Sequence, residues 1–233
     1  MRLLLTRPQA DSEALAERLQ ALGHGVVIAP VMEIRPIRTV LDFTGVQGIV
    51  VTSRNGLAVL AALTSRRDFP IYAVGPASAA AAAKAGFAHI HKAGGDVDAL
   101  ARLIQATCRP EAGALIHAVG SVQAGDLAGV LARAGFEVRR AVLYEGRPAA
   151  ALPEAARTAL RAGELDAVLL YSPRTAKLLD ELAKSAGLAT ALGRLTAYCL
   201  SQAVATAATP SGYHHLAVAA VPEEGSLLRL LQA

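Results

Sequence analysis

The chain has 233 residues, of which 53% are hydrophobic and only 4% aromatic, with no tryptophan. A chain of this length can bury one large core or two small ones, and its Ala, Leu and Val side chains suit helices packed on a parallel sheet. Its 23 basic and 19 acidic residues give a formal net charge of +4 without a long basic run, which argues against nucleic-acid binding. The composition therefore indicates an α/β protein.

The first eight residues contain a short apolar run that ends in Arg7-Pro8. This run is too short for a signal segment or a membrane span, so it predicts a first strand and no membrane partner. Cys108 and Cys199 are not spaced as a metal or redox pair, and lone thiols of this kind are typical of reduced intracellular proteins. We therefore expect a cytoplasmic protein.

The first half of the chain predicts strands that alternate with helices. Helices are expected to end at Gly23 and Gly86, because glycine is common just beyond a helix. Segment 32–40 contains Pro36 and predicts a bridging stretch rather than a central strand. We expect strands at 3–5, 26–29, 48–52 and 71–75, and helices at 12–22, 57–63, 77–85 and 97–106.

The second half predicts the same alternation, after a loop at 110–113. A helical connection is expected at 149–165, and a short helix after Pro222 closes the chain. We expect strands at 114–118, 138–145, 168–170, 197–200 and 216–220, the last at a sheet edge, and a helix at 176–182.

Three strand-turn-helix segments occur twice along the chain. Segment 6–23 resembles 120–135, segment 49–63 resembles 168–182, and segment 71–87 resembles 197–213. The alignment places Ser53 on Ser172 and Ser78 on Ser201. A duplication of this kind predicts two similar lobes, with the ligand between them.

The turns of these segments are rich in Ser, Thr and Gly. In parallel sheets such turns lie at the carboxyl edge, where helix N-termini attract carboxylate or phosphate groups. For any single serine, capping of a helix is the alternative role. The repetition at six turns favours an acidic ligand, and the residues at this edge are Thr6, Arg7, Thr52, Ser53, Arg54, Gly75, Ser78, Gly120, Ser121, Ser172, Arg174, Ser201 and Gln202.

Several common motifs are missing from the sequence. There is no phosphate-binding loop, no dinucleotide-binding glycine fingerprint after the first strand and no nucleophile elbow, which argues against a nucleotide-binding protein and against a hydrolase. None of the six histidines has a partner at a metal-ligand spacing. His89 and His91 would point the same way on a strand, but we predict no metal site.

Tyr144 is the candidate catalytic residue. It lies at the end of a predicted strand, next to a predicted crossing between the lobes. A phenol is protonated at neutral pH, so Tyr144 can donate a proton to a leaving oxygen. Tyr171 and Tyr198 lie inside predicted strands and are expected in the core.

With these motifs in order, the sequence resembles the uroporphyrinogen-III synthase family over its whole length. The resemblance implies two α/β lobes, each a parallel sheet flanked by helices, with the active site in the cleft between them. It implies a first lobe of 1–35 plus 148–233, a second lobe of 39–143, and connecting strands at 36–38 and 144–147. The motifs that carry the resemblance are Leu5-Thr6-Arg7-Pro8, Thr52-Ser53-Arg54-Asn55-Gly56, Ala73-Val74-Gly75-Pro76-Ala77-Ser78, the unit from Gly120 to Tyr144, and Tyr171-Ser172-Pro173.

The resemblance also implies the reaction. The expected substrate is hydroxymethylbilane, a linear tetrapyrrole with eight carboxylates, which is cyclised to uroporphyrinogen III with loss of water and inversion of ring D through a spiro intermediate. This step serves heme, siroheme and cobalamin biosynthesis and needs no cofactor or metal. In the family, the residue matching Tyr144 is proposed to assist loss of the hydroxyl, and those matching Ser78, Ser172 and Ser201 line the cleft. Pro173, next to Ser172, is also expected to contact the substrate. We expect a monomer that receives substrate by transient handover from hydroxymethylbilane synthase.

One feature departs from the family pattern. Arginines often flank the glycine that matches Gly120, whereas this chain has Val119 before it and Gln123 and Ala124 after it. Backbone amides are therefore expected to carry more of the binding there. The alternative functions are a non-catalytic two-lobed binding protein and a sensor module for an anionic small molecule.

Overall fold

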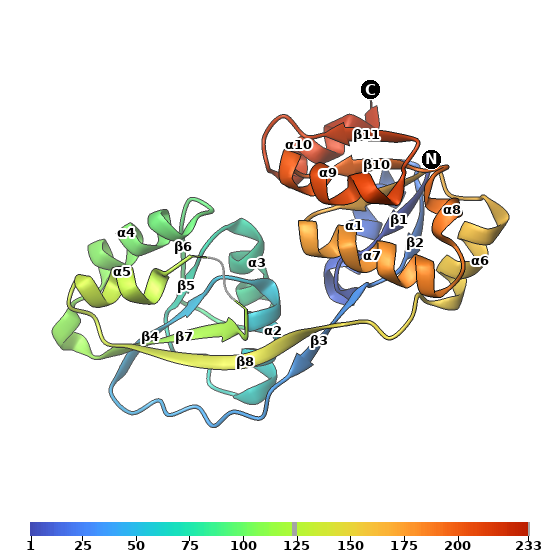
Figure 1. Ribbon diagram of the computed structural model, residues 1–233. Helices are drawn as coiled ribbons and strands as arrows, with labels where there is room; N and C mark the ends of the chain where they lie inside the picture. Colours follow the sequence, from blue (N-terminus) through green and yellow to red (C-terminus); the bar gives the residue numbers. More distant parts are fainter. Residues whose placement is uncertain (123–124, 233) are drawn as a thin grey trace. The chain divides into compact units, whose positions relative to one another are not determined.

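The computed structural model describes residues 1–122 and 125–232, and it divides into two compact units. Unit 1 comprises Met1–Glu33 and Arg147–Ala233, and unit 2 comprises Ile34–Gly146. Each unit contains a parallel sheet flanked by helices (Figure 1), which confirms the predicted fold class. At one edge of the unit 2 sheet the chain at 31–37 runs antiparallel to 143–149. Gln123 and Ala124, which depart from the family pattern, lie outside the described residues.

The sheet of unit 1 has five parallel strands in the order β11-β10-β9-β1-β2. The last strand of the chain lies at the edge, as the sequence predicts. The strands are β1 (Arg2–Leu5), β2 (Gly25–Ile28), β9 (Ala167–Leu170), β10 (Thr196–Cys199) and β11 (His215–Val218).

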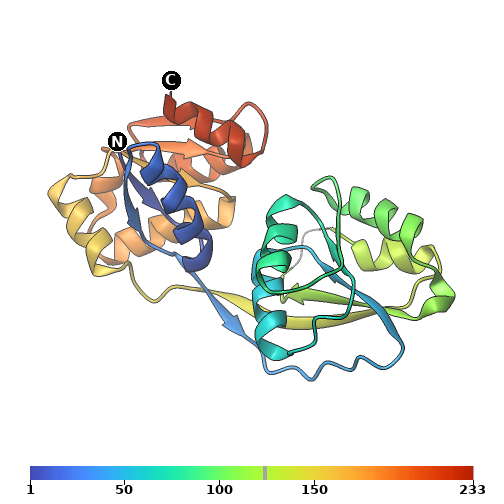
Figure 2. The ribbon, with the colours of Figure 1, turned by 180° about the vertical axis from the view of Figure 1, so that it is seen from behind.

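Helices cover both faces of this sheet. Leu4 points into a core shared with α6 (Glu154–Ala162), α7 (Pro173–Ser185), α8 (Ala189–Leu192) and α9 (Gln202–Ala208). Leu3 and Leu5 point to the other face, because side chains alternate along a strand. There they join a second core under α1 (Gln9–Ala21) and α10 (Glu224–Arg229), and α1 is seen in Figure 2.

The sheet of unit 2 has the order β3-β8-β7-β4-β5-β6. Its β3 edge strand occupies part of the predicted bridging stretch 32–40. The chain passes between the units within β3 and β8, which each span a unit boundary. The strands are β3 (Met32–Pro36), β4 (Val46–Val51), β5 (Ile71–Ala73), β6 (Ile90–Lys92), β7 (Ala114–Gly120) and β8 (Val138–Pro148).

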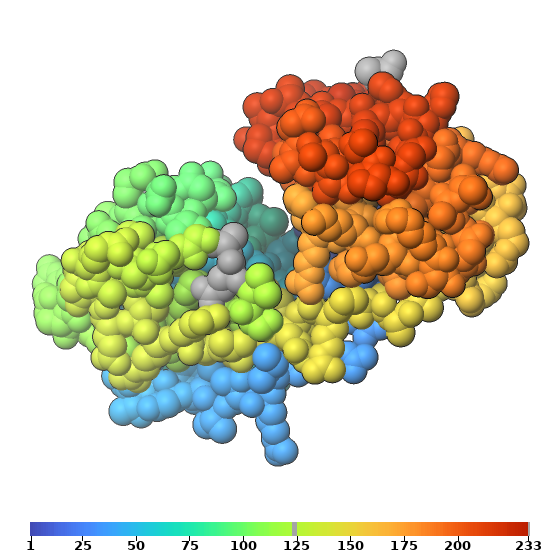
Figure 3. Space-filling view, in the orientation of Figure 1, coloured from blue at the N-terminus to red at the C-terminus, as the bar shows by residue number. Residues whose placement is uncertain are grey.

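Two pairs of helices enclose this second sheet. Helices α2 (Arg54–Leu63) and α3 (Pro76–Lys84), visible in Figure 2, share one core with the sheet. Helices α4 (Val97–Thr107) and α5 (Leu127–Arg133) share the other. The segment between β3 and β4 lies at the surface (Figure 3), and its Val40 is 95% exposed.

The remaining short elements are single 3-10 turns at Pro110–Ala112, Thr209–Ser211 and Leu230–Gln232. Within the described residues, no helix has the length and apolar character needed to cross a bilayer.

Three sequence predictions need correction. The helix expected at 12–22 begins at Gln9, directly after Pro8. The helical connection expected at 149–165 is helical only over Glu154–Ala162. Pro153 keeps the residue before it out of helical geometry, and Gly163 ends the helix with φ 68°. The loop expected at 110–113 contains a 3-10 turn.

The two sheets have the same strand order once they are read in corresponding directions. Unit 1 runs β2-β1-β9-β10-β11, and unit 2 runs β8-β7-β4-β5-β6, with β3 added beyond β8. The three repeated sequence segments therefore occupy equivalent places in the two units.

Candidate functional site

The centre of the unit 2 sheet is a topological switch point. From β4 the chain turns to β5 on one side, and from β7 it turns to β8 on the other. Ligands of open parallel sheets bind where such loops diverge at the carboxyl edge. In unit 2 these loops contain Thr52, Ser53 and Arg54 after β4, and Gly120 and Ser121 at the end of β7.

The strand register brings Ser53, Gly120 and Tyr144 into one row. Val51, the last residue of β4, pairs with Ala118, and Ser53 and Gly120 each follow two residues later in their chains. Gly120 pairs with Tyr144 because a register shift after Val119 skips Leu143. The row therefore crosses β4, β7 and β8 at the switch point.

The Tyr144 side chain reaches across this row to Ser53. Its hydroxyl lies 2.9 Å from Ser53 Oγ. Ser53 is the N-cap of α2, and its Oγ also accepts a hydrogen bond from Gly56 N at 2.9 Å. The backbone of Tyr144 is held as well, because Ser121 N donates to its carbonyl oxygen at 2.8 Å. The candidate acid is thus fixed at both its backbone and its hydroxyl.

The other predicted residues of unit 2 differ in exposure. Thr52 and Arg54 are half-buried beside Ser53, and Ser121 is exposed. Gly75 is the N-cap of α3 and is buried against Gly95. Ser78 lies in the first turn of α3 and is only 5% exposed, so its hydroxyl is enclosed by the protein.

The equivalent switch point of unit 1 lies between β1 and β9. The Thr6 hydroxyl is buried and donates to the Leu169 carbonyl at 3.1 Å. The Arg7 guanidinium contacts the carboxylates of Asp11 (3.1 Å) and Glu224 (2.9 Å) and lies 4.4 Å from the centre of the Tyr171 ring. The charge of Arg7 is therefore balanced within unit 1.

Tyr171 and Tyr198 were both predicted to be core residues. Tyr171 packs against the core under α1, and burial, with the Glu224 carboxylate, raises the pKa of its phenol. Tyr198 is half-buried, and its hydroxyl lies at the surface near Met1.

The serines of unit 1 have different local roles. Ser172 caps α7, since its Oγ accepts from Thr175 N at 3.1 Å, and Pro173 is the first residue of that helix. Ser201 stands at the N-cap of α9, but its side chain makes no capping bond to the described residues. Capping therefore accounts for Ser53 and Ser172, and it does not account for Ser78 or Ser201.

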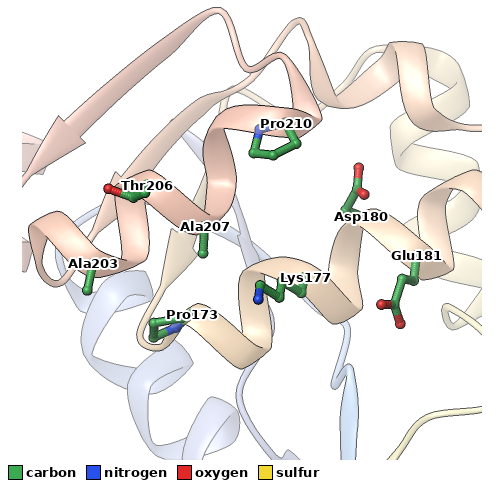
Figure 4. Close-up of a pocket in the computed structure, with 8 residues that line it drawn as sticks. All are labelled: Pro173, Lys177, Asp180, Glu181, Ala203, Thr206, Ala207 and Pro210. Atoms are coloured by element: carbon green, nitrogen blue, oxygen red, sulfur yellow. The ribbon is translucent and has the colours of Figure 1, made fainter.

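A pocket of ≈ 440 Å³ lies between α7 and α9 in unit 1. Of the predicted site residues, it contains only Pro173. Figure 4 shows its lining: Pro173, Lys177, Asp180, Glu181, Ala203, Thr206, Ala207 and Pro210. Its charged side chains have both signs, so the pocket does not select an anion.

The histidines show no arrangement for a metal. His89 precedes β6, so it does not share a strand with His91, whose ring stacks on Tyr72 at 4.8 Å. Among the described residues, no three His, Cys, Asp or Glu side chains are grouped as metal ligands. His117 is buried in β7, and burial, with a smaller effect of Arg140, lowers its pKa to about 4.

Comparison with known proteins identifies the family. The family model described as uroporphyrinogen-III synthase HemD matches residues 13–229. The chain belongs to the uroporphyrinogen-III synthase family. The resemblance predicted from the sequence is therefore confirmed, and the chain is a member of an enzyme family of tetrapyrrole biosynthesis.

Solved structures agree with this assignment at the level of the fold. The uroporphyrinogen-III synthetase of Helicobacter pylori has a TM-score of 0.66 and 17% identity, covering 100% of this chain and 99% of that one. A mutant uroporphyrinogen III synthase of Thermus thermophilus has a TM-score of 0.50 and 22% identity, covering 100% and 97%. A search of curated proteins gave no match.

Ser53, Gly120 and Tyr144 can each be predicted from the sequence as site residues, but their meeting in one place cannot. The signal that joins them is the register of β4, β7 and β8. That register includes an irregular step at Gly120, which hydrophobic alternation does not encode.

Proposed function

We propose that this chain is a uroporphyrinogen-III synthase that cyclises hydroxymethylbilane to uroporphyrinogen III. The observation that supports this beyond family membership is the 2.9 Å hydrogen bond between Tyr144 and Ser53 at the switch point of unit 2. It holds a proton donor at the sheet edge where ligands of this fold class bind.

The first step breaks the C–O bond of the ring A hydroxymethyl group. Tyr144 donates its phenolic proton to the departing hydroxide, so water leaves and an azafulvenium cation remains. The substituted carbon of ring D then attacks this cation and forms the spiro intermediate. The bond between that ring D carbon and the ring C methylene then breaks, and the free α-carbon of ring D attacks the ring C methylene, which inverts ring D. This α-carbon loses its proton, which restores the phenol, so the net change is the loss of one water.

Positioning is the main demand on the protein, because hydroxymethylbilane also closes without an enzyme, with ring D uninverted. Holding the chain folded for the spiro path makes that path effectively intramolecular. We propose that the turns after β4, β7, β1 and β9 contact substrate carboxylates through backbone N–H groups. The positive ends of α2 and α7 support this role.

The test is product analysis. Freshly generated hydroxymethylbilane is incubated with and without the protein, the products are oxidised, and uroporphyrin isomers I and III are separated by chromatography. We expect the protein to shift the product to type III. Type I alone from folded protein would contradict the proposal and favour a non-catalytic binding protein or sensor for an anionic small molecule.

The supply of substrate can be tested in the same assay. We propose transient handover from hydroxymethylbilane synthase, because free substrate is lost to uncatalysed closure. The slow variant Tyr144→Phe, added in about tenfold excess, should then raise the type I fraction more when hydroxymethylbilane synthase generates the substrate in the assay than when preformed substrate is supplied. An equal rise in the two assays would mean that the substrate diffuses freely.

A further inference from the structure

Gly120 provides the space that the Tyr144 ring occupies. A Cβ atom placed on Gly120 would lie 2.7 Å from Tyr144 Cζ, 2.8 Å from Cε2 and 3.0 Å from the hydroxyl oxygen. Gly120 has no positive φ, so backbone conformation does not require glycine there. The requirement comes from the ring that lies over it.

Ser53 fixes the other end of the same side chain. Its Oγ already accepts a hydrogen bond from Gly56 N, and it has one hydroxyl proton to donate. Gly56 is itself close-packed, since a Cβ there would lie 3.1 Å from the Ala118 carbonyl oxygen. The start of α2 is therefore pressed against β7, and Ser53 is held in place at the 2.9 Å contact.

The two hydrogen bonds can run in series, each pointing toward the Tyr144 hydroxyl. Gly56 N–H donates to Ser53 Oγ, Ser53 O–H can donate to the Tyr144 oxygen, and the Tyr144 proton is then free for the substrate. Each bond polarises the next, and the first comes from the N-terminus of the ten-residue helix α2. A phenolate formed in the reaction would keep the hydrogen bond from Ser53.

We propose that Ser53 and Gly120 are positioning residues for Tyr144, with Ser53 donating the hydrogen bond that stabilises the phenolate and Gly120 admitting the ring. This inference rests on the proposed function. It gives Ser53 a role toward Tyr144 in place of the predicted contact with substrate.

The corresponding positions of unit 1 provide a comparison with Ser53 and Gly120. Ser172 matches Ser53 and caps its helix in the same way. The position that matches Gly120 is Thr6, whose side chain is buried and bonded to Leu169. Unit 1 therefore has the cap and lacks the space for an overlying ring at this position.

The first test measures Tyr144 without substrate. The five tyrosines are replaced by 3-fluorotyrosine, and the Tyr144 fluorine resonance is assigned by its loss in Tyr144→Phe. Removing a donor destabilises the phenolate, so in Ser53→Ala the resonance should titrate at a higher pH than in the parent protein. Ser53→Thr, which keeps a hydroxyl, should titrate as the parent protein does.

The matched control is Asp96→Ala. Asp96 is the N-cap of α4 in the same unit, where it accepts from Ala99 N, and it has no tyrosine partner among the described residues. Its loss removes a cap and should leave the Tyr144 titration unchanged. An equal shift in Ser53→Ala and Asp96→Ala, or no shift in either, would overturn the role of Ser53.

The second test uses turnover. We expect Ser53→Ala to lower kcat about 10-fold with little change in KM, and Ser53→Thr to recover most of the loss. Gly120→Ala should lower kcat as much as Tyr144→Phe does. Adding either change to Tyr144→Phe should cost little more, because the changes act through one hydroxyl.

Additive losses in these double variants would overturn the proposal. That result differs from a failure of the proposed function, in which the parent protein would form no type III product at all. The fluorine titration remains valid in either case, because it requires no turnover.

Discussion

Tyr144→Phe removes the phenolic hydroxyl and keeps the ring that lies over Gly120. The variant should therefore fold normally, lose its hydrogen bond to Ser53 and lack the proton donor for the departing hydroxide. We expect kcat to fall about 100-fold, within the usual range for a general acid, with KM nearly unchanged. Initial rates of type III formation, corrected for uncatalysed closure, provide the measurement. A variant with full turnover would exclude Tyr144 as the acid.

Burial of His117 makes the stability of the protein depend on pH. The residue is 3% exposed in β7, and neither ring nitrogen has a hydrogen-bond partner among the described residues. Burial, with Arg140 as the smaller cause, lowers its pKa from 6.5 to about 4. Below pH 6.5 the unfolded chain therefore binds a proton that the folded chain does not. The free energy of unfolding should fall as the pH drops from 6.5 to about 4, by about 3 kcal/mol from this group, and level off below that.

The variant His117→Leu tests this pH dependence. It removes the titrating ring from β7 and replaces it with an apolar side chain. Leu115, two residues earlier on the same strand, lies in a core cluster that also contains Leu131. Urea unfolding between about pH 7.5 and pH 4 should show a shallower loss of stability in this variant than in the parent. The exposed His214 gives the control, because His214→Gln should leave the slope unchanged. Parallel curves for the parent and His117→Leu would show that His117 does not titrate as proposed.

Arg67 joins the carboxyl ends of two helices. Its guanidinium donates to the carbonyls of Ala61 and Thr64 at the end of α2 and of Ala85 at the end of α3, at 2.6–2.9 Å. It also lies 4.8 Å from the centre of the Phe87 ring. One side chain thus satisfies carbonyls that the two helices leave open.

Removing Arg67 should destabilise unit 2. We expect Arg67→Ala to lower the free energy of unfolding by about 2–3 kcal/mol, as for loss of charged hydrogen bonds. Arg67→Lys should restore only part of this, since an ammonium group cannot reproduce the planar fork. Urea denaturation gives the values. Arg66→Ala, next in sequence and exposed, is the control and should have a smaller effect; equal effects would contradict the capping role.

The helices and strands could be predicted from the sequence where residues close together in the chain determine them. The run of Leu3, Leu4 and Leu5 predicts a strand buried on both faces, and Gly23 and Gly86 end helices with φ of 82° and 89°. The start of α6 was not predictable from its Ala and Arg content, because Pro153 sets it.

The meeting of Ser53 and Tyr144 was also beyond the sequence. These residues are 91 positions apart, and their approach depends on a register shift between β7 and β8. Helical periodicity and strand alternation report which face a residue occupies. They do not report which residue of a neighbouring strand lies beside it, so the site could be predicted only as separate turns.

At the scale of the whole molecule, the repeated segments form two sheets with one strand order, and the side chains at their switch points differ. In unit 2 a glycine leaves room for Tyr144, whereas in unit 1 the matching residue is Thr6, whose hydroxyl donates to Leu169, and the Arg7 guanidinium lies on the Tyr171 ring. The fold therefore supplies two similar frames, and a few side chains decide which frame holds the candidate acid.

Unit 2 should fold without unit 1. It is one continuous stretch of chain, and its two core clusters, including the residues packed against them, use only positions 41–144. A fragment of residues 32–148 keeps β3 and β8 whole. We expect it to unfold cooperatively in urea, because each face of its sheet retains its helices.

Leu131 provides the check on that fragment. It is a fully buried residue of α5, and Leu131→Ala should lower the free energy of unfolding by about 2–5 kcal/mol, to the same degree in the fragment and in the complete chain. The fragment should form no type III product, because it lacks the turns after β1 and β9. A gradual, non-cooperative unfolding curve, or an effect of Leu131→Ala seen only in the complete chain, would mean that unit 2 depends on unit 1 for its core.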